Sequence, residues 1–197
     1  AILRNIAEYF FEKNHYEEAL DIFHMLLDDN QNQPELLEKI GFCYQRMENY
    51  PKALTFYRKI ELSSSPGLWV LKNMGLCYRK MEDFESALDI YRQAVKIQEE
   101  DERIETLMAY CNMKLDRFDT ALQQYFKLEY MQPDNHKVVR PIAWCYLNTG
   151  EREKSEKYFK KVLELNPGYY DFVNYGHLKW TRSEEHTSEL QSLLIIS

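Results

Sequence analysis

The chain has 197 residues, of which 45% are apolar and 29% are charged, the composition of a folded globular protein rather than a disordered one. Its formal net charge of −7 argues against general binding to nucleic acid or to an anionic membrane surface, so we expect no nucleic acid as a partner. We also expect no membrane insertion. No apolar run is long enough for a transmembrane helix, and the few glycines and prolines favour helices.

The predicted elements are pairs of helices that follow one another from the start of the chain to about residue 181. In the second pair, Leu37, Ile40 and Tyr44 share one face at helical spacing. The segment Asn49-Tyr50-Pro51 then interrupts the pattern, and because proline is favourable in a first helical turn, a second helix is expected to start there. Pro141 lies inside the first helix of the fifth pair, so we expect it to kink that helix or to delay its start.

All four cysteines stand 34 residues apart, at Cys43, Cys77, Cys111 and Cys145. A fixed period of this length indicates a helical unit that is repeated and stacked. Equivalent positions on successive units are separated by an intervening helix, which places these residues too far apart for disulfides, and no pair has the close spacing of zinc ligands. We therefore expect four buried thiols in the core.

Small and aromatic residues repeat at the same period. A small residue in the first helix of a pair lets the two backbones approach, and an aromatic residue in the second helix fills the gap beside it. The small residues are Ala7, Gly41, Gly75, Ala109 and Ala143 in the first helices and Ala19, Ala53, Ala87, Ala121 and Ser155 in the second, where Phe23, Tyr57, Tyr91, Tyr125 and Phe159 follow four residues later.

This pattern resembles the tetratricopeptide repeat (TPR) family over residues 1 to about 181. The resemblance implies an all-α, right-handed superhelical solenoid of antiparallel helix pairs, with five repeats plus one further helix. The expected repeats are 1–33, 34–67, 68–101, 102–135 and 136–168, with a half-repeat at 169–181. Two departures are Asn112, which replaces the tyrosine of the fourth repeat, and Gly176, which comes one residue early.

Residues 182–192 match the translation of a widely used short-read sequencing adapter. We therefore expect residues 182–197 to be an artefactual, non-native tail without a functional role. The natural protein would then continue beyond Thr181, and helix 169–181 would lack its partner helix, leaving Phe172, Val173 and Trp180 poorly covered. Because the chain begins at Ala1 rather than at a methionine, we also expect upstream residues, and with them an anchor or a signal, to be missing. The buried thiols favour a cytoplasmic location, with the periplasm as the open alternative.

No pattern in the chain indicates catalysis. It contains no glycine-rich phosphate loop, its five histidines are scattered, and no two histidines stand at i, i+4. We expect no catalytic residues, no metal site and no cofactor, and therefore no enzyme.

The informative surface is the face of each first helix that lies opposite its packed stripe. In the TPR family this face lines a concave groove that binds peptides or helices. Its positions in the third to fifth repeats hold seven bases and no acid, together with aromatic and apolar residues. The resemblance and this pattern predict partner-binding residues Phe42, Arg46, Lys72, Leu76, Arg79, Lys80, Arg103, Tyr110, Lys114, Arg140 and Trp144.

We therefore predict a non-catalytic scaffold that binds a partner peptide or helix in a groove with basic walls and an aromatic floor. The expected partner is a protein or peptide, acidic and with apolar anchors. Two alternatives stay open: a sensory or regulatory TPR region of a larger signalling protein, and a helical repeat that binds glycans or RNA. The predicted groove residues could also simply pack against neighbouring helices.

Overall fold

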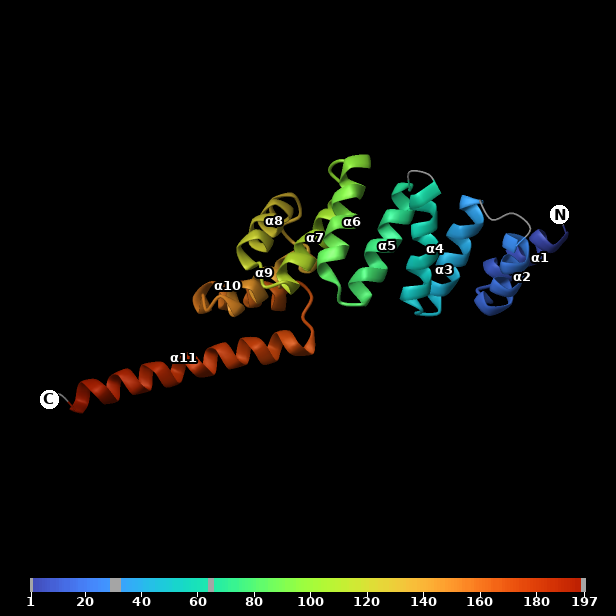
Figure 1. The fold of residues 1–197 in the computed structure, drawn as a ribbon. Helices are drawn as coiled ribbons and strands as arrows, with labels where there is room; N and C mark the ends of the chain where they lie inside the picture. The colour runs from blue at the N-terminus through green and yellow to red at the C-terminus, as the bar shows by residue number, and fades with distance from the viewer. Residues whose placement is uncertain (1, 29–32, 64–65, 196–197) are drawn as a thin grey trace. The chain divides into compact units, whose positions relative to one another are not determined.

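A computed structural model describes residues 2–28, 33–63 and 66–195, and its regular structure in these ranges is entirely helical (Figure 1). The two terminal residues of the predicted tail, 196 and 197, lie outside the described residues, whereas 182–195 are helical. The helices are α1 (Ile2–Glu12), α2 (Tyr16–Asp28), α3 (Pro34–Arg46), α4 (Tyr50–Ser63), α5 (Leu68–Lys80), α6 (Phe84–Ile97), α7 (Glu102–Lys114), α8 (Phe118–Met131), α9 (His136–Asn148), α10 (Arg152–Leu165) and α11 (Tyr169–Ile195).

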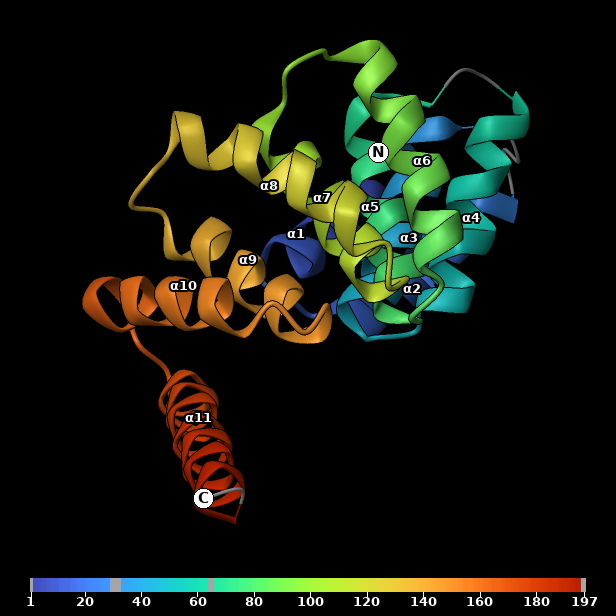
Figure 2. The ribbon, with the colours of Figure 1, turned by 90° about the vertical axis from the view of Figure 1, so that its left-hand side faces the viewer.

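The chain divides into two compact units, residues 1–104 and 105–197. In the first unit the pairs α1–α2, α3–α4 and α5–α6 pack side by side, and α2 and α4 each also contact the first helix of the next pair (Figure 1). In the second unit α9 packs against both α8 and α10, and α10 contacts α11 (Figure 2). Nowhere in the described residues does a helix have the length and apolar character of a membrane span.

Within a pair, the two helices approach closely where the first helix has a small residue. A Cβ placed on Gly41 would lie 2.7 Å from Cε1 of Tyr57, and one on Gly75 would lie 2.3 Å from Cε1 of Tyr91. Both tyrosines are fully buried, so neither ring has room to move aside. The predicted fit of a small residue against an aromatic ring is confirmed at both places.

The four cysteines are buried and carry free thiols, as predicted. Burial raises the pKa of the Cys43, Cys77 and Cys145 thiols to about 12, because the thiolate would lose its hydration in the core. These cysteines therefore act as small apolar core residues rather than as nucleophiles.

The first helix of each pair ends on a residue with left-handed backbone. In α3, the Glu48 N–H donates to the Gln45 carbonyl at 3.0 Å and the Asn49 N–H donates to the Tyr44 carbonyl at 2.8 Å. This is the Schellman arrangement, which satisfies the last carbonyls of a helix and turns the chain sharply. Among the described residues, five with left-handed backbone recur every 34 positions, at Asn14, Glu48, Glu82, Asp116 and Gly150, and a further one, Glu100, lies outside this series.

Pro141 does not delay the helix that contains it. The helix α9 begins at His136, five residues before the proline, and the Asn135 side chain accepts a hydrogen bond from the Lys137 N–H. The predicted late start is therefore wrong, because capping by Asn135 and burial of Val138 and Val139 on the packed face hold the first turn in place.

The start of α11 is fixed by a buried carboxylate. Asp171 accepts hydrogen bonds from the Gly168 N–H at 2.7 Å and from Nε of Arg140 in α9 at 3.0 Å. By contrast, Phe172, Val173 and Trp180 are 57%, 46% and 58% exposed, which confirms that they are poorly covered. The first turn of α11 is thus joined to α9 through Asp171, and the same helix exposes the apolar side chains of Phe172, Val173 and Trp180.

Candidate partner-binding surface

The first unit contains an open pocket of about 270 Å³ where the end of α3 meets the middle of α5. Three predicted residues, Arg46, Leu76 and Lys80, contribute to its lining. The rest of the lining was not predicted and comes from α3, from the turn after it and from the start of α4: Gln45, Glu48 and Tyr50.

The second unit contains a larger open pocket of about 450 Å³, formed by α7, the turn after it, the start of α8 and the middle of α9. It brings together three predicted residues: Tyr110, Lys114 and Trp144. Its other lining residues are Met113, Asp116, Phe118 and Asn148.

The two pockets occupy the same place in the repeat. Adding 68, or two repeat lengths, to each lining position of the first pocket gives a lining position of the second. Glu48 thus corresponds to Asp116, Tyr50 to Phe118, and Leu76 to Trp144. A feature that returns at the same register in two separate units is a property of the repeat rather than an accident of packing at one place.

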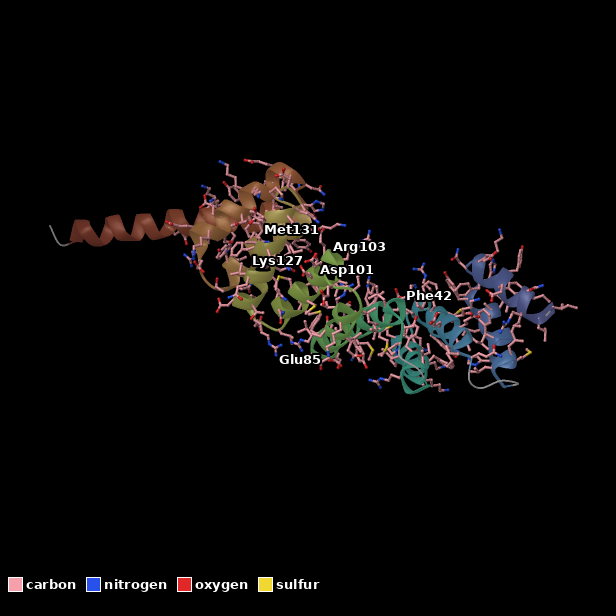
Figure 3. All side chains as sticks on the ribbon, turned by 90° about the horizontal axis from the view of Figure 1, so that it is seen from above. Phe42, Glu85, Asp101, Arg103, Lys127 and Met131 are labelled. Atoms are coloured by element: carbon pink, nitrogen blue, oxygen red, sulfur yellow. The ribbon has the colours of Figure 1, made fainter. Side chains whose placement is uncertain are left out.

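Phe42, the first residue of the predicted aromatic floor, lines neither of these two pockets. Its ring, labelled in Figure 3, has three aromatic neighbours within the described part of the chain. The ring centroid lies 5.6 Å from that of Phe11, 6.2 Å from that of Tyr16 and 5.7 Å from that of Trp69. These contacts leave it half-buried, so it packs mainly against its neighbours. Trp144 keeps 36% of its surface exposed and contacts only one ring among the described residues, that of Phe159.

Two of the predicted basic residues form ion pairs with carboxylates of their own unit. Lys72 Nζ lies 2.6 Å from Oδ2 of Asp101, just before α7. Arg140 contacts Asp171 and also donates to the Asn166 carbonyl at 2.8 Å. Each pair joins a base near the start of one first helix to a carboxylate at the start of the next, so these bases mainly hold successive repeats together.

Asp101 also caps the start of α7, since its carboxylate accepts from the backbone N–H groups of Arg103 and Ile104 (Figure 3). Burial raises the pKa of Asp101, but the hydrogen bond from Lys72 and those from the two N–H groups outweigh burial and lower it. The predicted residue Arg103 is exposed at this helix start, and Arg79 is half-buried on α5.

The bases at the ends of the first helices are placed differently. Arg46, Lys80 and Lys114 are exposed and line the pockets. The Arg46 guanidinium lies 5.9 Å from the Tyr16 ring centroid, and Lys114 Nζ lies 5.8 Å from that of Tyr110. Within the described chain, none of the three has a carboxylate at ion-pair distance, so their charges are available to a ligand.

Sequence reasoning missed the acidic residues Glu48 and Asp116, which line the pockets next to these bases. A signal for them was present, because Asn14 and Gly150 stand at the same repeat position and both residue types tolerate left-handed backbone. The described side chains contain no group of three or more His, Cys, Asp or Glu placed to hold a metal ion.

Comparisons with known proteins place the chain among helical repeats. A family model described as "Tetratricopeptide repeat" matches residues 32–100, and a second with the same description matches residues 142–169. No curated protein sequence matches the chain at a significant level.

Solved structures of MamA are similar in fold. One, described as "MamA 41-end from Desulfovibrio magneticus RS-1", has a TM-score of 0.75 at 20% identity and covers 83% of this chain and 93% of that one. Another, described as "MamA AMB-1 P212121", has a TM-score of 0.72 at 17% identity and covers 87% and 95%. At such identities the likeness concerns the fold alone, and it confirms the predicted all-α solenoid.

Proposed function

Because this chain is a tetratricopeptide repeat protein, we propose that it is a non-catalytic scaffold that binds a segment of a partner protein at the pockets of its first helices. The observation that carries this proposal is the return of one pocket at the same register in both units. TPR proteins bind proteins or peptides, and a repeated pocket suits a partner that contacts several repeats.

The composition of the pockets supports a partner that is acidic and has apolar anchors. Arg46, Lys80 and Lys114 supply exposed positive charge, and an Arg or Lys pairs strongly with a carboxylate. Trp144 supplies a large, stiff and partly exposed ring, the type of residue that dominates binding energy at interfaces. Glu48 and Asp116 lie beside these groups, so the pockets also select against ligands that are acidic throughout.

Capture of cellular partners on the immobilised chain tests the proposal. Arg46→Glu with Lys80→Glu, and separately Lys114→Glu with Trp144→Ala, should each reduce capture of the same partners. Lys96→Glu and Lys160→Glu are matched controls, since these exposed lysines lie on the second helices α6 and α10 and have no ion pair in the described chain. Capture that survives both double substitutions, in chains that unfold at the normal temperature, would exclude the proposal.

A tryptophan-fluorescence titration separates this proposal from the binding of glycans or RNA. Trp144 in the second pocket is the reporter, and Trp144→Phe identifies its share of the signal from the chain's three tryptophans. We expect acidic peptides that contain an aromatic residue to change the Trp144 emission. A response to a glycan or to RNA but not to such peptides would favour the alternative function.

A further inference from the structure

The two pockets share their register but differ in chemistry. The first has two bases, Arg46 and Lys80, where the second has Lys114 and the uncharged Asn148. The second instead has Trp144 where the first has the smaller Leu76. Equivalent pockets with different linings are suited to different side chains of a ligand.

The first pocket offers hydrogen-bond donors and a net positive charge. Its charged groups are Arg46, Lys80 and one acid, Glu48. The Tyr50 hydroxyl is protonated at neutral pH, as in any tyrosine, and is therefore a donor; burial and the nearby Glu48 raise its pKa further. Gln45 is already bonded, since its Nε2 donates to Asn73 at 2.9 Å and its Oε1 accepts from Tyr57 at 3.1 Å, and it therefore forms a fixed wall.

The second pocket is dominated by apolar groups. The rings of Tyr110, Phe118 and Trp144 line it together with Met113, and Phe118 and Met113 also pack against the buried core of this unit. Among the described residues, Lys114 and Asp116 are its charged lining groups.

Three aromatic rings beside an acid are also a means of binding a cation. Here Lys114 Nζ already lies 5.8 Å from the Tyr110 ring centroid. Its positive charge repels a second cation at that face, so the remaining rings favour an uncharged apolar or aromatic side chain.

We propose that the pockets divide recognition between them: the first binds a carboxylate side chain of the partner, and the second binds a large apolar or aromatic one. This inference rests on the proposed function and assigns a ligand chemistry to each half of the site.

Chemical-shift mapping on the intact ¹⁵N-labelled chain tests this division. The probes are the Nα-acetyl amides of glutamate, phenylalanine and lysine. The glutamate probe should shift amide signals around Arg46 and Lys80, and added salt should weaken this effect by screening the charges. The phenylalanine probe should shift signals around Met113 and Trp144, with little dependence on salt.

Paired substitutions supply the control. Arg46→Gln with Lys80→Gln should weaken binding of the glutamate probe about fivefold, which is the loss expected for an exposed ion pair. Binding of the phenylalanine probe should not change. Trp144→Ala should give the reverse result.

Three outcomes would overturn the division: the lysine probe binding in the second pocket, the glutamate probe binding there more tightly than in the first, or no shift from any probe at millimolar concentration. Failure of the proposed function is distinguishable from these, because partners would then be captured equally by the wild type and by both double variants. If capture needs the pockets but the probes do not discriminate between them, only the division is wrong.

Discussion

Glu48, Glu82 and Asp116 each lie two positions after the last residue of a first helix and have left-handed backbone, at φ of 60°, 61° and 57°. A residue with a Cβ is strained there by about 1 kcal/mol, and an acid at a helix C-terminus also opposes the helix dipole. Three of the five repeats carry an unfavourable acid where the other two have Asn14 and Gly150. Two of these acids, Glu48 and Asp116, line the two pockets.

Replacing Glu82 with glycine should therefore stabilise the chain. Glu82→Gly removes both the strained Cβ and the acid, and the free energy of unfolding should rise by about 0.5–1 kcal/mol. Urea denaturation monitored by circular dichroism measures this change. Gly150→Ala makes the opposite change at the equivalent position, where φ is 79°, and should lower the free energy of unfolding. If Glu82→Gly and Gly150→Ala both had the same free energy of unfolding as the wild type, there would be no backbone strain at this position.

Gly75→Ala should destabilise the chain, because the new Cβ would lie 2.3 Å from Cε1 of Tyr91, a fully buried ring. We expect a loss of about 1–3 kcal/mol, typical of an overpacked core. Gly41→Ala should cost less, since its closest approach to Tyr57 is 2.7 Å. Gly176→Ala is the control: nothing lies within 4 Å of its Cβ, and alanine favours the helix there. In thermal unfolding, Gly75→Ala should lower the midpoint temperature most, Gly41→Ala less and Gly176→Ala least. A Gly75→Ala variant as stable as the wild type would be inconsistent with the close contact.

At the scale of the helix, the bases of the first helices separate into two sets by position. Lys72 and Arg140, near the start of their helices, pair with carboxylates that begin the next first helix, whereas Arg46, Lys80 and Lys114 end their helices at the pockets. The first set joins neighbouring first helices, and the second has no carboxylate at ion-pair distance within the described residues. Substitution of Lys72 or Arg140 should therefore lower the free energy of unfolding more than it lowers the affinity for a partner.

The Lys72–Asp101 pair should make stability depend on pH in acid. The pKa of Asp101 is lowered in the folded chain from the ordinary value of 3.8, so its contribution is complete above that value and is lost as the pH falls through the folded-state pKa. Asp101→Asn retains the amide acceptor at the start of α7 but removes the charge. The variant should be less stable than the wild type at pH 7, and the difference should vanish below the folded-state pKa. A difference that persists unchanged into strong acid would rule out the charge as its source.

Asp171→Ala should release the start of α11 without unfolding the rest of the second unit. The substitution removes the acceptor of the Gly168 N–H and the partner of Arg140. Hydrogen exchange should accelerate in residues 169–181 and stay slow in α9 and α10. Exchange that accelerates equally in all three helices would show that Asp171 supports the whole unit rather than one helix.

Much of the fold was predictable from the sequence, because the repeat aligns small, aromatic and cysteine positions that only a stacked helical pair satisfies. The pockets were predictable in part. The exposed bases at the helix ends follow from helical spacing, but the pairing of Lys72 with Asp101 joins residues 29 positions apart, and spacing within one helix says nothing of it. Glu48 and Asp116 were missed because an acid in a polar turn resembles any solvated residue until its backbone angle is known.

At the scale of the whole molecule, a repeat protein can unfold locally. The stability of each repeat depends on its own contacts and on those with its immediate neighbours. Each unit contains two of the four buried cysteines: Cys43 and Cys77 in the first, Cys111 and Cys145 in the second. The thiols are inaccessible in the folded chain, so each becomes reactive only when its own repeat opens.

The four buried cysteines can therefore report local opening of the repeats that contain them. Under mild denaturant and an excess of an alkylating reagent, the rate at which each thiol gains mass reports the free energy of opening of its repeat. If Cys43 and Cys77 are modified at one rate and Cys111 and Cys145 at another, each unit opens cooperatively. Four different rates would instead show that the repeats open one at a time. The native cysteines distinguish these two kinds of opening without a dye or an inserted label.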